Sequence, residues 1–230
     1  MTRILAIEAA TEACSAALLI GDSVQERFEV APRRHVALLL PFVESLLAEA
    51  GIRPGDLDAV AFGRGPGSFT GLRIAAGITQ GIAFGSDLPV IPVSTLAALA
   101  QGTVRQQGAV NVLAALDARM QEVYWGAFRC DTEGLVVAVG KEQVCAPEAV
   151  ECPQTGDWSG AGNGWQAYAD QLSQRCAVPG AAIYAQQQPQ AADVARLAVA
   201  AFAQGEVLAP EQVCPVYLRN DVARKPQAGG

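Results

Sequence analysis

The sequence predicts an α/β protein built from two related halves. Each half begins with three β-like runs and continues as helix, strand and helix, the pattern of a duplicated α/β unit. The similarity between the two halves in sequence is too weak to prove a duplication. A chain of 230 residues suffices for one large or two small domains. We therefore expect two lobes, residues 1–105 and 106–230, with the C-terminal helix free to pack back on the first lobe.

The first half is divided by turn and capping residues. Gly21 and Asp22 mark a hairpin turn, Gly51 suits a left-handed helix cap, and Ser94 can cap a short helix. The expected strands are Arg3–Glu8, Cys14–Ile20, Ser23–Val30, Asp58–Gly63 and Leu88–Val93. The expected helices are Pro32–Ala50, Ser68–Gly85 and Ser94–Gln101.

The second half opens on strands again, with a turn at residues 131–134. The expected strands are Val112–Asp117, Glu122–Cys130, Leu135–Val144 and Trp158–Gly160. A polar helix is expected over Asn163–Arg175 and an alanine-rich one over Ala191–Gln204. We expect the tail, residues 220–230, to be mobile because it contains a proline and ends in glycines.

Composition restricts the classes of partner. The net charge of −7 opposes binding to phosphate backbones and anionic membranes, so autonomous RNA or DNA binding is not expected. No apolar run approaches the ~20 residues that cross a bilayer, and the start lacks the features of a signal peptide. We expect a cytoplasmic protein. Only 17% of residues are charged, against roughly 25% in an average domain, so some apolar surface can be buried against another chain.

The six cysteines are scattered and form no C-x-x-C pair. We interpret them as small apolar residues or free thiols of a reducing compartment, with no disulfide framework. They are Cys14, Cys130, Cys145, Cys152, Cys176 and Cys214.

A glycine-dense turn, G-R-G-P-G-S-F-T-G-L-R, joins a predicted strand to a predicted helix. It resembles a phosphate loop, but no lysine follows Gly71, and Ser68 stands where the dinucleotide fingerprint needs glycine. Four glycines in nine residues exceed what a simple N-cap turn requires. We interpret the turn as a structural device that directs the following helix toward a second protein. Its glycines are Gly63, Gly65, Gly67 and Gly71.

The two long helices of the first half lack a clear solvent face. In the second of them, Gly77, Gly81 and Gly85 recur at intervals of four, which permits close approach of another element. Each glycine costs a helix about 1 kcal/mol relative to alanine, so close packing is the natural compensation. We expect a partner surface, and complete burial within this chain is the alternative. The expected interface residues are His35, Leu38, Leu39, Phe42, Leu46, Arg73, Ile74, Gly77, Ile78, Gly81 and Ile82.

Polar residues at strand ends are compatible with nucleotide contact. Glu8 could hold Mg²⁺ with phosphates, and Thr11 offers a hydroxyl. Asp117 and Arg119 can pair with each other or face a cleft. His35 is the only histidine, so a histidine-based metal site or a nucleophile–histidine mechanism has little support. We expect no metal site and no catalytic residue in this chain.

Several segments together closely resemble the bacterial TsaB family. The resemblance covers nearly the whole chain in the family's order, and the glycine turn is highly specific to it. The matching segments are Ile4–Thr11, Arg34–His35, Gly63–Arg73, Val93–Leu96, Asp117–Arg119, Glu122–Tyr124 and Pro215–Arg219. One departure is that many relatives have Asp-Thr where this chain has Glu8 and Ala9.

The resemblance implies a two-lobed fold of the actin, sugar-kinase and Hsp70 type. It also implies a role in forming N6-threonylcarbamoyladenosine (t6A) beside the anticodon of tRNA. TsaB-like proteins are thought to be degenerate relatives of the catalytic subunit TsaD, which they bind and activate, and the ATPase TsaE completes the assembly. TsaD-like chains hold a metal through two helical histidines, and His35 has no such companion.

The resemblance further implies docking through the two long helices, as a homodimer when the chain is alone or as a heterodimer with TsaD. tRNA would be met only through the complex. We expect this chain to require no cofactor, and the interface of the complex is a possible site for ATP or ADP. The leading hypothesis is a non-catalytic scaffold. The alternatives are an autonomous ATP-dependent kinase or ATPase that uses Glu8, and a peptidase, which would need a nucleophile beside His35.

Overall fold

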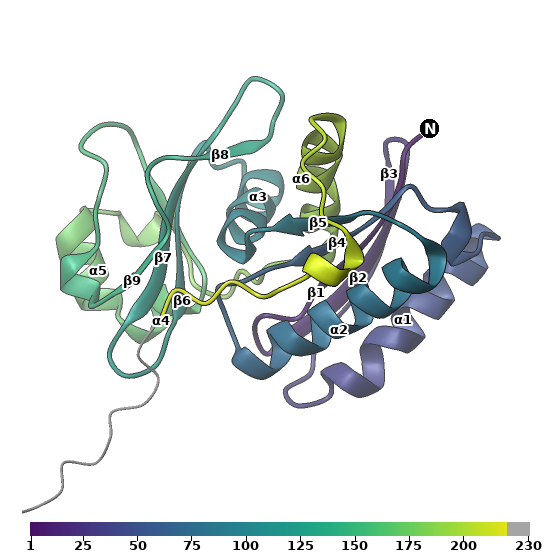
Figure 1. Cartoon of the computed structure of the whole chain (residues 1–230). Helices are drawn as coiled ribbons and strands as arrows, with labels where there is room; N and C mark the ends of the chain where they lie inside the picture. Colours follow the sequence, from purple (N-terminus) through teal and green to yellow (C-terminus); the bar gives the residue numbers. More distant parts are fainter. Residues whose placement is uncertain (220–230) are drawn as a thin grey trace, which may run out of the picture.

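Two α/β lobes lie side by side in the computed structural model, which describes residues 1–219 (Figure 1). The expectation for the tail, residues 220–230, falls outside the described residues. The first sheet has the order β3-β2-β1-β4-β5, and β1 pairs antiparallel with β2 and parallel with β4. Its strands are β1 (Arg3–Glu8), β2 (Ala13–Ile20), β3 (Ser23–Val30), β4 (Ala59–Gly63) and β5 (Val90–Val93).

The second sheet repeats this arrangement. Its order is β11-β10-β6-β7-β8, and its central strand β6 again pairs antiparallel with the next strand, β7, and parallel with a later one, β10. A short strand, β9, also pairs with β7. The strands are β6 (Asn111–Asp117), β7 (Val123–Cys130), β8 (Val136–Ala138), β9 (Gln143–Cys145), β10 (Ser159–Ala161) and β11 (Ile183–Tyr184). The repeated order confirms the predicted α/β fold with two related lobes.

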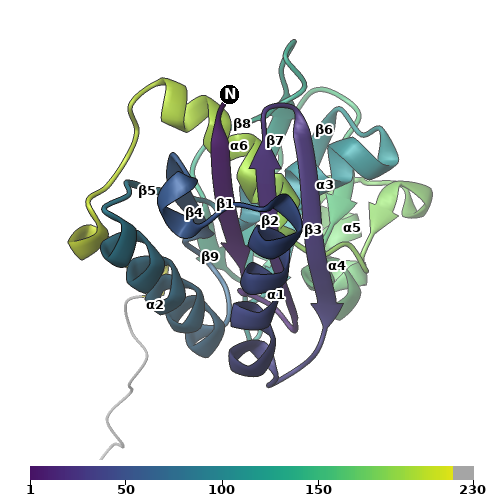
Figure 2. The ribbon, with the colours of Figure 1, turned by 90° about the vertical axis from the view of Figure 1, so that its right-hand side faces the viewer.

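Helices separate and cover the two sheets. On the outer face of the first sheet lie α1 (His35–Ala50) and α2 (Phe69–Ser86), side by side (Figure 2). Between the sheets lie α3 (Thr95–Gln107) and α6 (Ala191–Ala203), and α6 packs on the inner face of the first sheet. On the outer face of the second sheet lie α4 (Asn163–Ala167) and α5 (Ala169–Cys176). Four short 3-10 helices are η1 (Pro54–Asp56), η2 (Pro147–Ala149), η3 (Gly180–Ala182) and η4 (Pro210–Gln212).

Some element boundaries differ from the sequence predictions for local backbone reasons. Helix α1 begins at His35 rather than Pro32, because Arg33 adopts the left-handed region at φ 66°. The strand expected over residues 135–144 is divided into β8 and β9, with Gly140 at φ 92° between them. The polar helix is interrupted at Tyr168, whose φ of −133° is not helical. Strand β11 was not predicted, and no α-helix separates β9 from β10.

The cysteine expectation was wrong for one pair. Cys152 and Cys176 form a disulfide across a separation of 24 residues, with their Cα atoms 5.5 Å apart. No sequence spacing signals this pair, because only the packing of α5 against the segment around η2 brings the two residues together. The other four cysteines are free thiols. Within residues 1–219, no helix has both the length and the apolar character needed to cross a membrane.

Candidate functional site: an apolar helical face and the adjoining cleft

The outward surface of α1 and α2 is apolar, and we call it the α1–α2 face. Val36 is 67% exposed, Leu40 47% and Phe84 66%, which is unusual for large apolar side chains. Five further apolar residues of the two helices pack partly on the core and remain partly accessible. These are Leu38, Phe42, Ile74, Ile78 and Ile82.

The glycines of α2 leave this face open. Gly77, Gly81 and Gly85 are exposed, and a Cβ atom added to any of them would meet no atom of residues 1–219 within 4 Å. Packing within this described part of the chain therefore does not explain why these positions carry glycine. Phe84 follows Gly77 by seven residues and so lies on the same side of the helix.

The structure separates the expected interface residues into two groups. Leu39 and Leu46 are fully buried in the first lobe's own core, and His35 is also buried. These three residues hold α1 on the sheet and offer little or no area to a partner. Val36, Leu40 and Phe84 were not among the expected interface residues, although the unbroken apolar run from Val36 to Val43 was a signal for the first two.

The glycine turn is packed too tightly to surround a phosphate. A Cβ on Gly71 would lie 1.9 Å from the Ala9 carbonyl oxygen, and one on Gly67 would lie 2.5 Å from the Ala10 carbonyl oxygen. Gly65 has φ 103°, and a Cβ atom added to it would lie 2.8 Å from the Val216 carbonyl oxygen. The glycines thus allow the turn to lie directly against the β1–β2 turn and the C-terminal segment. Ser68 accepts a hydrogen bond from the Gly71 amide at 3.4 Å and caps α2.

Glu8 is enclosed beneath this turn. Its carboxylate accepts hydrogen bonds from the Ala10 amide at 2.7 Å and the Thr95 hydroxyl at 3.3 Å. Gly63 makes room for it, since a Cβ there would stand 1.9 Å from a Glu8 oxygen. Burial raises the pKa of Glu8 to about 7, against the smaller opposing effect of these hydrogen bonds. The structure does not place Glu8 in the cleft where the other candidate nucleotide residues lie.

The buried Glu8 predicts a pH-dependent stability. The unfolded chain releases this proton near pH 4.5 and the folded chain near pH 7, so the free energy of unfolding falls as pH rises between these values. The loss amounts to about 3 kcal/mol. Glu8→Gln should remove this slope and be more stable than the natural chain at pH 8 but not at pH 4.5. Urea unfolding at both pH values measures this, and equal pH slopes for the two proteins would refute it.

A cleft of about 910 Å³ lies between the lobes at the N-terminal ends of α1 and α2. It brings together Thr11, His35, Arg73, Asp117 and Arg119, which are far apart in the sequence. Among residues 1–219, four arginines but only two carboxylates line the cleft, in a chain whose net charge is −7. The arginines are Arg33, Arg73, Arg119 and Arg219, and the carboxylates are Glu12 and Asp117.

Aromatic rings accompany the arginines in the cleft. Phe69 and Tyr217 have ring centroids 5.4 Å apart, and the Arg73 guanidinium lies 3.5 Å from the Phe69 centroid. Sequence reasoning missed Phe69 and Tyr217 as site residues, although both belong to segments of the family resemblance. The combination of guanidinium groups and exposed rings suits an anionic ligand with a flat base.

The predicted polar residues of the cleft are largely engaged with the protein. The His35 Nε2 donates to the Thr11 carbonyl at 2.9 Å, which ties the start of α1 to the β1–β2 turn. Asp117 accepts from the Arg119 amide and guanidinium, both at 2.8 Å. Arg119, Met120 and Gln121 all have positive φ, a costly arrangement that holds this turn at the edge of the cleft. Within residues 1–219, no three His, Cys, Asp or Glu side chains are grouped as a metal site.

Comparisons with known proteins identify the family. The family model of TsaD, tRNA N6-adenosine threonylcarbamoyltransferase, matches residues 29–226. The tRNA threonylcarbamoyladenosine biosynthesis protein TsaB of Escherichia coli K12 is 46% identical over 232 residues, which cover 99% of each chain. The chain belongs to the TsaB family. A TsaB protein of Haemophilus influenzae is 40% identical, over 98% of this chain and 97% of its own length.

A solved structure supports the same assignment. YeaZ from Pseudomonas aeruginosa superposes with a TM-score of 0.89 at 47% sequence identity, covering 95% of this chain and all of that one. The TsaD model extends through both lobes, in agreement with the repeated sheet order. The predicted two-lobed α/β fold is thereby confirmed for this TsaB-family chain.

Proposed function

We propose that this chain is a non-catalytic subunit for t6A formation in tRNA and that it acts by docking on TsaD through the α1–α2 face. The names of the TsaB relatives support the pathway. The observation that carries the docking proposal is the open space at Gly77, Gly81 and Gly85. Three glycines destabilise helix α2 by about 1 kcal/mol each, and no packing contact in the described part of the chain compensates this loss.

A partner helix would make these glycines useful. Without Cβ atoms, the α2 backbone can be approached closely, and the exposed Val36, Leu40 and Phe84 would be removed from water at the same time. A second copy of the chain could occupy the same face, which gives a homodimer in the absence of TsaD. Docking on TsaD would replace that contact.

The cleft adjoins the docking face and supplies a place for a nucleotide of the complex. Arg73 of α2 and Arg33, just before α1, line it, so a partner seated on the two helices would border the cleft. We assign ATP or ADP to this position at the interface, with TsaE as the third protein. In this proposal, tRNA is held by the complex in the cytoplasm.

The structure gives the autonomous enzymes less support. A kinase or ATPase built on Glu8 would need that carboxylate to reach a nucleotide, but Glu8 is buried and hydrogen-bonded to the protein. A peptidase would need His35 beside a nucleophile, and its Nε2 donates to a backbone carbonyl. The scaffold proposal requires neither group to react.

Reconstitution tests the proposal. Purified chain, TsaD and TsaE are combined with tRNA, an activated threonylcarbamoyl donor and ATP, and t6A is measured with each protein omitted in turn. We expect t6A to fall to background without this chain, and the chain alone to form none. Calorimetric titration of the isolated chain with ATP and Mg²⁺ should show no turnover. Full t6A formation without the chain, or ATP hydrolysis by the chain alone, would contradict the proposal.

A further inference from the structure

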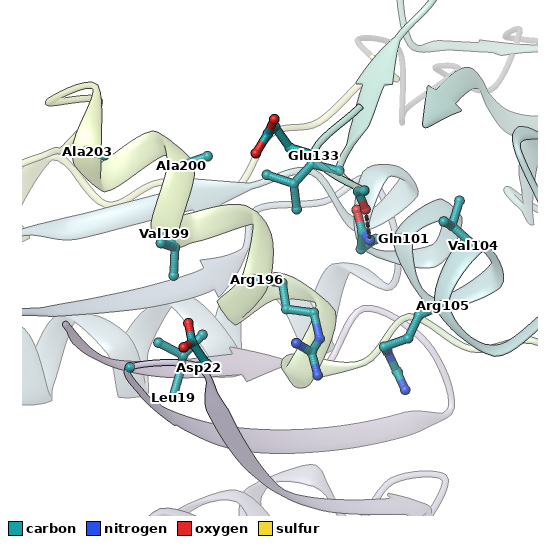
Figure 3. A pocket seen from close by; sticks show the side chains of 13 residues that line it. Leu19, Asp22, Gln101, Val104, Arg105, Glu133, Arg196, Val199, Ala200 and Ala203 are labelled. Atoms are coloured by element: carbon teal, nitrogen blue, oxygen red, sulfur yellow. Dashed lines mark hydrogen bonds between the residues drawn. The ribbon is translucent and has the colours of Figure 1, made fainter. Parts of the chain in front are cut away.

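A second cavity of about 780 Å³ opens on the protein surface between α3, α6, the β2–β3 hairpin and the turn that leads to β8 (Figure 3). It shares no lining residue with the cleft at the ends of α1 and α2. Its walls are mostly apolar, and the residues that form them include Leu19, Val104, Leu135, Val199 and Ala203. The cavity is therefore a separate candidate site.

Arg196 is the unusual group in this cavity. Its side chain extends from α6 into the space between α3 and the β2–β3 hairpin (Figure 3). The Nε atom is buried and has no hydrogen-bond partner within residues 1–219, and no ion pair among those residues includes Arg196. The buried Nε–H itself cannot be reached from the cavity, but the terminal guanidinium nitrogens also make no hydrogen bond within residues 1–219 and are not enclosed in the same way. These nitrogens are therefore the groups that an external acceptor can use.

Arg105, the other arginine that lines this cavity, already has hydrogen-bond acceptors within the chain. Arg105 donates from Nε and Nη2 to the two carboxylate oxygens of Asp193, both at 2.9 Å, and from Nη2 to Gln190 at 3.0 Å. Asp193 is fully buried and binds Arg105 in this way; Arg196 acts on it through charge, but no hydrogen bond joins the two side chains within residues 1–219. Of the two guanidinium groups in the cavity, that of Arg196 is the one left for a ligand.

The remaining groups of the cavity narrow the ligand chemistry. A carboxylate matches a guanidinium in geometry and charge. The acidic side chains of Asp22 and Glu133 also line the cavity and would repel a polyphosphate. The apolar walls favour an aliphatic body. We propose that this cavity binds a small aliphatic monocarboxylate, with its carboxylate on Arg196.

Nuclear magnetic resonance of the ¹⁵N-labelled full chain tests this proposal with sodium hexanoate as the probe. We expect saturable shifts of the Arg196 Nε–H signal and of the Val104 and Val199 amides, with a dissociation constant on the order of millimolar for so small a ligand. Arg196→Gln should weaken binding at least tenfold. Arg53→Gln, at an exposed arginine outside the cavity, is the matched control and should bind as the natural chain does.

Neutral and polyanionic probes decide the outcome even if Arg196→Gln fails to fold. Hexanamide has the same chain without the charge, and it should bind the natural protein at least tenfold more weakly than hexanoate. Equal binding of the two would overturn the role of Arg196. Tighter binding of ADP or inorganic phosphate at these signals, or no saturable shift with hexanoate, would overturn the monocarboxylate assignment.

Discussion

Gly81→Glu should leave this chain folded and abolish its complex with TsaD. In the described part of the chain, no atom lies within 4 Å of the position that the new Cβ would occupy, and glutamate is a better helix former than glycine. In the isolated chain, the substitution should therefore be neutral or stabilising by up to about 1 kcal/mol. In the complex, the same side chain would separate the two surfaces and bury an unpaired carboxylate, which costs several kcal/mol. We expect at least a hundredfold loss of affinity for TsaD and a parallel loss of t6A.

The control for this experiment is Gly180→Glu. Gly180 has negative φ and no atom within 4 Å of an added Cβ, but it lies in η3 of the second lobe, away from the α1–α2 face. Calorimetry measures TsaD affinity, and nucleoside analysis of tRNA measures t6A in cells that depend on each variant. The docking proposal fails if Gly81→Glu binds TsaD as tightly as Gly180→Glu does.

An uncharged substitution on the α1–α2 face tests whether a partner backbone packs closely against the glycines. Gly77→Ala adds one methyl group to an exposed helical position with no neighbour. The isolated chain should gain about 1 kcal/mol of stability, because alanine has the higher helix propensity. If a partner backbone lies against Gly77, TsaD affinity should fall about tenfold in the same protein, since overpacking at a close contact costs 1–3 kcal/mol. If the variant is more stable and binds TsaD with unchanged affinity, Gly77 does not contact the partner.

Gly71→Ala should have the opposite effect and destabilise the chain itself. The new Cβ would lie 1.9 Å from the Ala9 carbonyl oxygen, and the clash is with backbone that sits in the core of the first lobe. The start of α2 and the β1–β2 turn cannot easily move apart, because α2 is packed on the sheet and the Ser68 amide donates a hydrogen bond to the Ala10 carbonyl at 2.7 Å. We expect a loss of at least about 3 kcal/mol in the free energy of unfolding. For a chain of this length, the midpoint of thermal unfolding should fall by roughly 10 °C.

Gly85→Ala is the matched control for this prediction. It makes the same chemical change in the same helix, at a position with no neighbour within 4 Å, and should be neutral or stabilising. Urea unfolding of the two variants measures the difference. Equal stabilities would show that the turn can move away from the β1–β2 turn, and the structural explanation of its glycines would then be incorrect.

The strands and most helices were predictable because their signals are local. Short β-like runs bounded by turn residues identified β1 to β7, and Gly51 marked the end of α1. The special turns were less predictable. The residue types of Arg119, Met120 and Gln121 do not predict three consecutive residues with positive φ. This conformation depends on the packing around the cleft. Strand β11, with only two residues, is defined by its pairing with β10.

The candidate site was predictable in outline for a similar reason. The spacing of Gly77, Gly81 and Gly85 and the apolar run of α1 indicated a docking surface before any contact was known. Helical periodicity could not tell Leu39, which is buried, from Leu40, which is exposed, because both lie in an uninterrupted apolar segment. That distinction depends on how α1 is rotated on the sheet, and the rotation is set by contacts with β2 and its neighbours.

The sequence by itself determined the order of most strands and helices, the glycine pattern and the family, because each of these is specified by short segments of the chain. Only the tertiary structure decided where distant segments meet. It enclosed Glu8 beneath the glycine turn, joined Cys152 to Cys176 and placed Tyr217 against Phe69 in the cleft. Among residues 1–219, it also left the Nε atom of Arg196 without a hydrogen-bond partner beside a separate cavity. The physical reason is that burial, charge pairing and accessibility are properties of surroundings contributed by residues far away in the sequence.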